Sequence, residues 1–189
     1  MNKKITPNEI AALAQRNGYT FAQLMALIEV ESSGIGFSEK TGRIIIQFEP
    51  NWFKIEYKDW KAHQGTWINN GVSDQTKEWI AFDNAFAIDP DAAMESTSIG
   101  MMQVMGFHWK ELGFETVGAM WDFAKESEAN QVEIAIKFIK LNPKLDKALK
   151  NKDWPTVAYY YNGSGYKKFN YDHRLLAAFI KHSQKQNLS

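Results

Sequence analysis

Apolar residues recur every three to four positions over most of the chain, which predicts a mainly helical protein. Thr6 and Glu9 have the spacing of a capping box with Pro7 between them, so a first helix is expected to begin there and to end at Gly18. The same spacing recurs from Thr20 and predicts the start of a second helix.

The pattern changes after the second helix and then becomes helical again. Residues 44–49, Ile-Ile-Ile-Gln-Phe-Glu, form a β-rich run that predicts a short hairpin. Residues 56–73 are polar with scattered Trp and Gly, and we expect an irregular loop. Helical periodicity returns near Asp74; residues 126–142 are expected to form the longest central helix and residues 171–184 a terminal amphipathic helix. The predicted fold class is therefore mainly α, an α+β fold with one small β-hairpin after the second helix.

The second helix ends in two acidic residues, Glu29 and Glu31. At about 3.6 residues per turn, Glu31 lies on the apolar stripe that begins at Leu24, whereas Glu29 falls well off it, nearer the edge marked by Met25. A carboxylate directed into the interior is costly unless it is paired, and an unpaired one raises its pKa and keeps its proton. A carboxylic acid protonated near neutral pH is what general acid catalysis requires. The alternative is that Glu31 caps a loop or pairs with an Arg or Lys.

Composition narrows the classes of function. The chain has 189 residues, 44% hydrophobic and 14% aromatic, which predicts one packed domain over residues 1–189. Lys+Arg and Asp+Glu are both 22, so the zero net charge gives no support for nucleic-acid binding or for attraction to anionic surfaces. Cysteine is absent and the four histidines are scattered, so neither a disulfide nor a metal site is expected, and no cofactor is predicted. No Sec-type signal peptide is expected from the N-terminal residues, and no apolar run approaches the length that a membrane span needs.

Four motifs occur in order along the chain. They are Glu31-Ser32, Gly-Arg-Ile-Ile-Ile-Gln-Phe-Glu at 42–49, Ser-Ile-Gly-Met-Met-Gln-Val-Met-Gly at 98–106, and Tyr-Tyr-Tyr-Asn-Gly-Ser-Gly-Tyr at 159–166. Together they resemble the phage-type N-acetylmuramidase family of endolysin catalytic domains, in the lysozyme superfamily, over about residues 20–180. The chain departs from the family pattern at Ile99, where Trp is frequent, and after Phe-Glu, where it has Pro50-Asn51-Trp52.

The resemblance implies a lysozyme-like fold and assigns roles to two carboxylates. Many relatives also carry a separate wall-binding module, for which we expect no room in a chain of 189 residues. Glycoside hydrolysis in its usual form needs a protonated carboxyl for the leaving oxygen and a second carboxylate across the bond. Glu31 would be the acid and Glu49 the second carboxylate, which could orient a water or stabilise the oxocarbenium-like transition state. Glu49 could instead pair with Arg43 or a nearby lysine. Other candidates for the second carboxylate are Glu39, Asp83, Asp89 and Glu95.

Substrate contacts are expected from the later motifs. Residues 98–106 are predicted to form a tight turn into a short helix, with Gly100 permitting close approach to a sugar and Gln103 bonding an N-acetyl or hydroxyl group. The resemblance places Tyr161 near the acid and Asn162 near the substrate, although Asn-Gly is also a common helix stop. The candidate substrate-binding residues are Ser98, Gly100, Gln103, Tyr161, Asn162 and Trp52.

The expected activity is cleavage of the β-1,4 bond between N-acetylmuramic acid and N-acetylglucosamine in peptidoglycan. The alternatives are a lytic transglycosylase acting on the same bond and a non-catalytic peptidoglycan-binding module; a helical partner-binding protein would leave the ordered motifs unexplained. The expected partner is the peptidoglycan glycan strand, bound by a monomer. Such a protein, made in the cytoplasm without a Sec signal, would reach the wall through a holin or a specialised export route.

Overall fold

The computed structural model describes residues 4–32, 34–69 and 74–186 of the chain. Ten helices, three short strands and three 3-10 turns are found in this part of the chain. The helices are α1 (Pro7–Asn17), α2 (Phe21–Ser32), α3 (Pro50–Glu56), α4 (Gln75–Ile88), α5 (Pro90–Glu95), α6 (Val117–Glu126), α7 (Glu128–Leu141), α8 (Pro143–Asn151), α9 (Trp154–Asn162) and α10 (Tyr171–Gln186). The strands are β1 (Ile46–Phe48), β2 (Thr97–Ile99) and β3 (Val104–Met105), and the 3-10 turns are η1 (Thr66–Ile68), η2 (Gly106–His108) and η3 (Ser164–Phe169).

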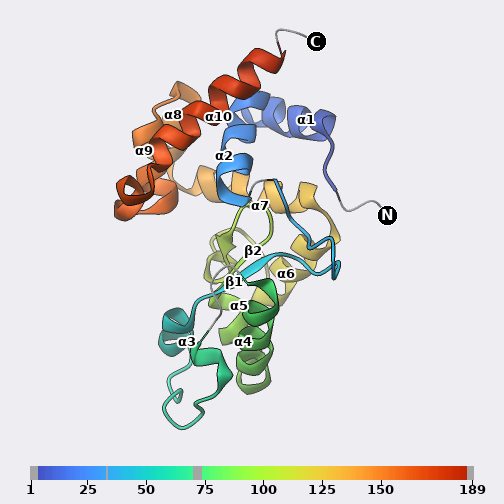
Figure 1. Cartoon of the computed structure of the whole chain (residues 1–189), viewed down its shortest axis with the longest axis vertical. Coiled ribbons are helices and arrows are strands. Elements are labelled where there is room, and N and C mark those ends of the chain that lie inside the picture. Colours follow the sequence, from blue (N-terminus) through green and yellow to red (C-terminus); the bar gives the residue numbers. More distant parts are fainter. Residues whose placement is uncertain (1–3, 33, 70–73, 187–189) are drawn as a thin grey trace.

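The helices gather into two lobes with α7 between them (Figure 1). One lobe holds α1, α2 and α8 to α10, and α2 packs along α10 there. The other lobe holds α3 to α5 and the small sheet. The mainly helical α+β fold class is therefore confirmed.

The first two helices begin where the capping patterns predict. The Thr6 hydroxyl accepts from the main-chain N–H of Glu9 at 3.3 Å, and the Glu9 carboxylate accepts from the N–H of Thr6 at 2.7 Å. Gly18 ends α1 in the left-handed conformation, with φ at 78°. Thr20 and Gln23 repeat the reciprocal bonds at the start of α2, at 2.7 and 3.2 Å. Both predicted starts are confirmed.

The β structure is present, but its pairing differs from the predicted local hairpin. β1 pairs antiparallel with β2, aligning Phe48 with Thr97, and β2 pairs antiparallel with β3. The segment directly before β1 contributes an isolated bridge between Phe37 and Ile44. Residues 98–106 were predicted to form a tight turn into a short helix. The tight turn is present at residues 100–103, but strands β2 and β3 flank it, and the 3-10 turn η2 begins only at Gly106. All three residues of β2 are buried, so its main-chain groups need hydrogen-bond partners, which β1 and β3 supply.

The core forms where the helical periodicity places it. The predicted apolar face of α7 is at most 4% exposed at Val132, Ala135, Ile136 and Ile139. Residues 126–142 were expected to form the longest central helix; α7 has 14 residues, the same as α4, and the terminal helix α10 is longer, with 16. The predicted loop at 56–73, of which residues 70–73 lie outside the described part, contains η1 and the fully buried Trp67. No helix of the described residues is long and apolar enough to cross a membrane.

Candidate active site

A cavity of about 520 Å³ lies where residues of the two lobes face each other. Glu31, Tyr161, Asn162 and Tyr171 come from α2, α9 and α10, and the opposite wall comes from the sheet and from α4. The structure thus brings six predicted site residues to one cleft, namely Glu31, Glu49, Ser98, Gln103, Tyr161 and Asn162. Gly100 and Trp52 do not line this cavity.

Glu31 lies in the last turn of α2, one turn beyond the buried side chains of Leu27 and Ile28. Its carboxylate accepts a hydrogen bond from Nδ2 of Asn162 at 2.9 Å, so its partner is an amide and not a basic side chain. Burial raises the pKa of Glu31 to about 7, although the Asn162 hydrogen bond and the positive charge of Arg174 oppose the rise. The carboxyl therefore keeps its proton over much of the acidic to neutral range.

Two residues at the end of α9 surround this carboxyl. Asn162 is the last residue of the helix, and its Oδ1 is buried without a hydrogen-bond partner among the described residues. The Tyr161 hydroxyl donates to the main-chain oxygen of Met102 at 3.1 Å. Burial, and after it the charge of Glu31, raises the pKa of Tyr161 well above its ordinary value. Tyr161 is therefore a neutral hydrogen-bond donor beside the acid.

Basic side chains of helix α10 bind a main-chain oxygen and the other acid, Glu29, in the last turns of α2. Arg174 donates from Nη2 to the main-chain oxygen of Val30 at 3.0 Å, directly before Glu31 in the chain. Lys181 and His182 both lie 2.8 Å from the Glu29 carboxylate. The hydrogen bond from Lys181 is the main cause that lowers the pKa of Glu29. The two acids of α2 thus have opposite environments, and only Glu31 is set to carry a proton near neutral pH.

Glu49 lies on the opposite wall, at the N-cap position of α3. Its Oε1 accepts a hydrogen bond from Nε2 of Gln47 at 2.6 Å. The predicted alternative, a pair with Arg43, is wrong: Arg43 lies 3.0 Å from Asp83 and stacks 3.4 Å above the ring of Trp79. Glu49 therefore faces the cleft with a neutral amide as its hydrogen-bonding neighbour.

The other acidic candidates lie outside this cleft. Glu39 pairs with Lys4 at 2.9 Å, and Glu95 accepts from the indole N–H of Trp109 at 2.7 Å. Asp89 caps α5 through Ala92. Sequence reasoning missed Glu78, a buried residue that does line the cleft and accepts from the N–H of Phe48 at 2.9 Å. Nothing in the sequence around position 78 indicates a hydrogen-bond partner thirty residues earlier.

The polar side chains of the β2–β3 turn form hydrogen bonds within the turn itself. Gln103, with φ at 51°, accepts from the Ser98 hydroxyl at 2.8 Å and donates to the Gly100 oxygen at 2.7 Å. Gly100 has φ at 70°, and a Cβ there would lie 2.5 Å from Cδ of Gln131. The side chain of Gln131 in turn accepts from the N–H of Met101 at 2.7 Å. Gly100 is thus required by close packing against α7, and Gln103 fixes the shape of the cleft wall.

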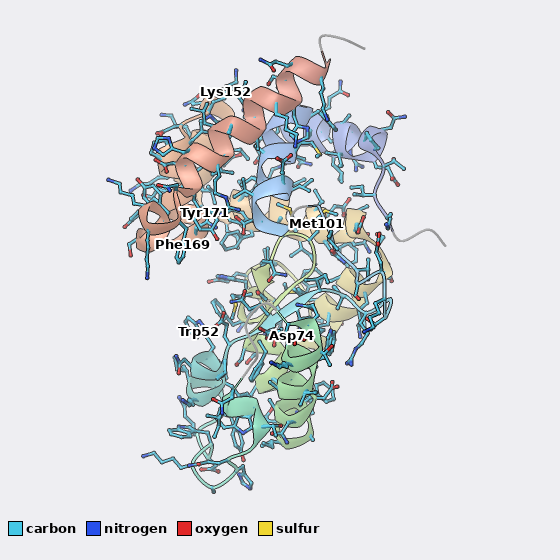
Figure 2. All side chains as sticks on the ribbon, viewed as in Figure 1. Trp52, Asp74, Met101, Lys152, Phe169 and Tyr171 are labelled. Carbon is cyan, nitrogen blue, oxygen red and sulfur yellow. The ribbon has the colours of Figure 1, made fainter. Side chains whose placement is uncertain are left out.

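Trp52 lies on α3, outside the cavity, and is 39% exposed. Its ring packs on Phe107 with the centroids 4.7 Å apart. Figure 2 shows Trp52 on one lobe, with Phe169 and the cleft residue Tyr171 on the lobe opposite. Trp52 therefore lies outside the cleft that holds Glu31.

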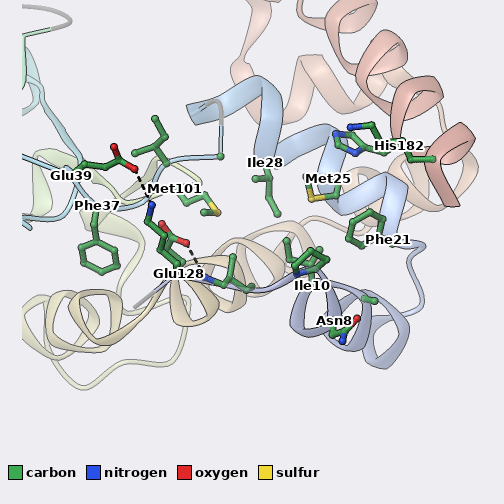
Figure 3. A pocket seen from close by; sticks show the side chains of 17 residues that line it. Asn8, Ile10, Phe21, Met25, Ile28, Phe37, Glu39, Met101, Glu128 and His182 are labelled. Carbon is green, nitrogen blue, oxygen red and sulfur yellow. Dashed lines mark hydrogen bonds and ion pairs between the residues drawn. The ribbon is translucent and has the colours of Figure 1, made fainter. Parts of the chain in front are cut away.

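A second cavity, of about 630 Å³, lies on another face of α2 (Figure 3). Apolar side chains such as Phe21, Met25 and Ile28 line it. Its two acids are both engaged: Glu39 pairs with Lys4, and buried Glu128 accepts from the main-chain N–H groups of Ile5 and Gly36 at 2.9 and 3.1 Å. This cavity therefore offers no acid poised to donate a proton, and the candidate active site is the cleft with Glu31.

A mainly helical fold with a buried acid at a helix end and a second carboxylate across a cleft defines a lysozyme-like class of glycan-cleaving enzymes. The N-acetylmuramidase family model matches residues 20–183, and the chain belongs to this family. The crystal structure of Burkholderia AP3 phage endolysin is similar, with a TM-score of 0.86 and 31% sequence identity over 98% of this chain and 73% of that chain. A comparison with curated proteins finds no match. The chain is therefore a peptidoglycan-cleaving enzyme of the bacterial cell wall.

Proposed function

We propose that this enzyme hydrolyses the β-1,4 bond between N-acetylmuramic acid and N-acetylglucosamine, with Glu31 as the general acid. The observation that carries the proposal is the buried Glu31 carboxyl, whose pKa is raised to about 7 at the wall of the cleft. A protonated carboxyl can give its proton to the glycosidic oxygen as the bond to C1 breaks.

Asn162 positions this acid. Its Nδ2 donates to Oε1 of Glu31 at 2.9 Å, which fixes the direction of the carboxyl at the end of α2. This bond favours the carboxylate and opposes part of the rise in the pKa of Glu31, so the role of the amide is to hold the carboxyl in place at the cleft wall. Tyr161 contributes a hydroxyl that remains protonated and ties the end of α9 to the loop before β3.

Glu49 acts from the opposite wall. As the sugar acquires oxocarbenium character, a carboxylate across the bond stabilises the positive charge or orients the attacking water. Water adds at C1 and passes a proton to a carboxylate of the cleft, either Glu49 or the now ionised Glu31, while the departing sugar keeps the proton that Glu31 gave it. Gln47 holds Glu49 through the 2.6 Å hydrogen bond and leaves its second oxygen available to the cleft.

Mass spectrometry of the products released from purified peptidoglycan tests the proposal. The wild-type protein should produce reducing muramic acid ends, and Glu31→Gln and Glu49→Gln should each lose at least about 100-fold in rate. Glu115→Gln, an exposed acid outside the cleft, is the matched control and should retain activity. Anhydro-muramic ends, with Glu49→Gln still active, would identify a single-acid lytic transglycosylase. Reducing glucosamine ends would show that the bond is wrong, and an inactive wild type would favour a binding module.

A further inference from the structure

The zero net charge of the chain conceals a strong separation of charge. From Pro143 to the end of the sequence there are nine Lys and Arg residues and three Asp and Glu residues, an excess of six positive charges. Residues 1–142 hold thirteen basic and nineteen acidic residues, an excess of six negative charges. The positive part corresponds to α8, α9, η3 and α10, which lie together in one lobe (Figure 1). A field of this kind attracts anionic polymers to one side of the molecule and orients them.

A cavity of about 500 Å³ lies within this basic lobe, between α8, α9 and η3. We name it the α8–α9 groove. The lining side chains with amine, amide or phenol groups that could bind a ligand are Lys144, Lys147, Asn151, Tyr159, Tyr160 and Tyr166. Lys144 and Lys147 are one helical turn apart and exposed, and neither forms an ion pair with a described residue. By contrast, Lys150 on the same helix lies 2.8 Å from Asp146. The groove thus presents two ammonium groups without ion-pair partners in the described part of the chain, beside phenol rings and a carboxamide; its one acid, Asp153, accepts from the main-chain N–H of Thr156 at 3.3 Å.

The groove and the catalytic cleft share helix α9. Tyr159 and Tyr160 line the groove, whereas the next two residues, Tyr161 and Asn162, line the cleft. A polymer that occupies the cleft and carries side branches would therefore place some branches within reach of the basic lobe. Peptidoglycan is such a polymer, because stem peptides with free carboxylates branch from its glycan strand.

We propose that the α8–α9 groove is a second wall-binding site, which holds the carboxylates of peptidoglycan stem peptides. Lys144 and Lys147 attract the carboxylates, and the tyrosines supply donors and apolar ring faces for the peptide. Because the groove is open to water, its attraction should weaken as salt screens the charges. The proposal assumes peptidoglycan as the substrate but not the identity of the bond that is cleaved.

Cosedimentation with insoluble peptidoglycan, stripped of attached polymers, tests the groove in the full-length chain. The double variant Lys144→Glu/Lys147→Glu should bind about tenfold more weakly than wild type at about 50 mM salt, and the difference should shrink at about 300 mM. Lys58→Glu/Lys61→Glu reverses the same charges with the same spacing in the other lobe and should bind within about twofold of wild type. Thermal unfolding shows whether each variant is folded.

Two further measurements separate this site from the cleft. Converting the peptidoglycan carboxylates to amides should reduce wild-type binding to the level of the groove variant and leave the groove variant unchanged. Cleavage of a soluble, peptide-free glycan oligomer should be the same in wild type and groove variant, so a failure of the catalytic proposal would be seen separately. Equal binding by the two proteins would overturn the proposal, as would wild-type binding that survives amidation. Binding that only a phosphate polymer or a nucleic acid competes away would also overturn it.

Discussion

Replacing Glu31 by Gln should stabilise the folded protein at alkaline pH while it removes activity. Burial raises the pKa of Glu31 from 4.5 to about 7, so the folded protein binds a proton that the unfolded chain has already released. The stability associated with this proton is complete below about pH 4.5 and is lost as the pH rises through about 7. A difference of that size in pKa corresponds to about 3 kcal/mol in the free energy of unfolding. Gln has a similar shape and carries no charge that must be buried.

Urea unfolding at several pH values measures this effect. The free energies of unfolding of wild type and Glu31→Gln should be similar near pH 4, and the variant should be about 2–3 kcal/mol more stable above pH 8. Glu115→Gln serves as the control, because that side chain is exposed, and it should show no gain that grows with pH. A stability difference independent of pH would refute the reasoning, since it would mean that the folded protein does not disfavour the ionised form of Glu31.

The remaining predictions concern the groups that support the cleft. Asn162→Leu removes a donor that favours ionised Glu31, so the alkaline limb of the pH profile of kcat/KM should move to higher pH; an unmoved limb would contradict this role. Glu128→Leu should lower the free energy of unfolding by about 2–4 kcal/mol, since two main-chain N–H groups lose their acceptor, and Glu128→Gln should cost less. Gly100→Ala should cost about 1–3 kcal/mol in a urea titration, because its Cβ would meet Gln131.

Helix starts were predictable because capping is local. The reciprocal bonds of Thr6 with Glu9 involve residues three apart, so their spacing in the sequence is sufficient evidence. The partner of β1 was not predictable, because β2 lies about fifty residues later and directly follows helix α5. Gln75 supplies a similar long-range contact, pairing its side-chain amide with both main-chain groups of Ile46 at 3.1 and 2.7 Å. Such contacts leave no periodic signal at either position.

The candidate site was likewise predictable where the signal is local in the sequence and not where it depends on long-range contacts. The direction of Glu31 followed from the apolar stripe of one helix, and the ordered motifs brought Glu49, Tyr161 and Asn162 to the same cleft. Residue type alone could not show that the side-chain amide of Gln103 forms its hydrogen bonds within its own turn. Arg174 was missed for a related reason: its partner is a main-chain oxygen, and main-chain groups are identical at every position of the sequence.

The placement of cations around α2 explains how an acid can keep a raised pKa beside a basic lobe. Lys181 and His182 on α10 are bonded to Glu29, and Arg174 donates to a main-chain oxygen instead of to Glu31. An ammonium on Glu31 itself would favour the carboxylate and remove the proton that catalysis needs. The positive charge of α10 therefore stabilises the packing of α2 without neutralising its acid. Other lysines of the same lobe, including those of the α8–α9 groove, are exposed to solvent and can attract anions there. The carboxyl of Glu31 in the cleft meanwhile remains neutral.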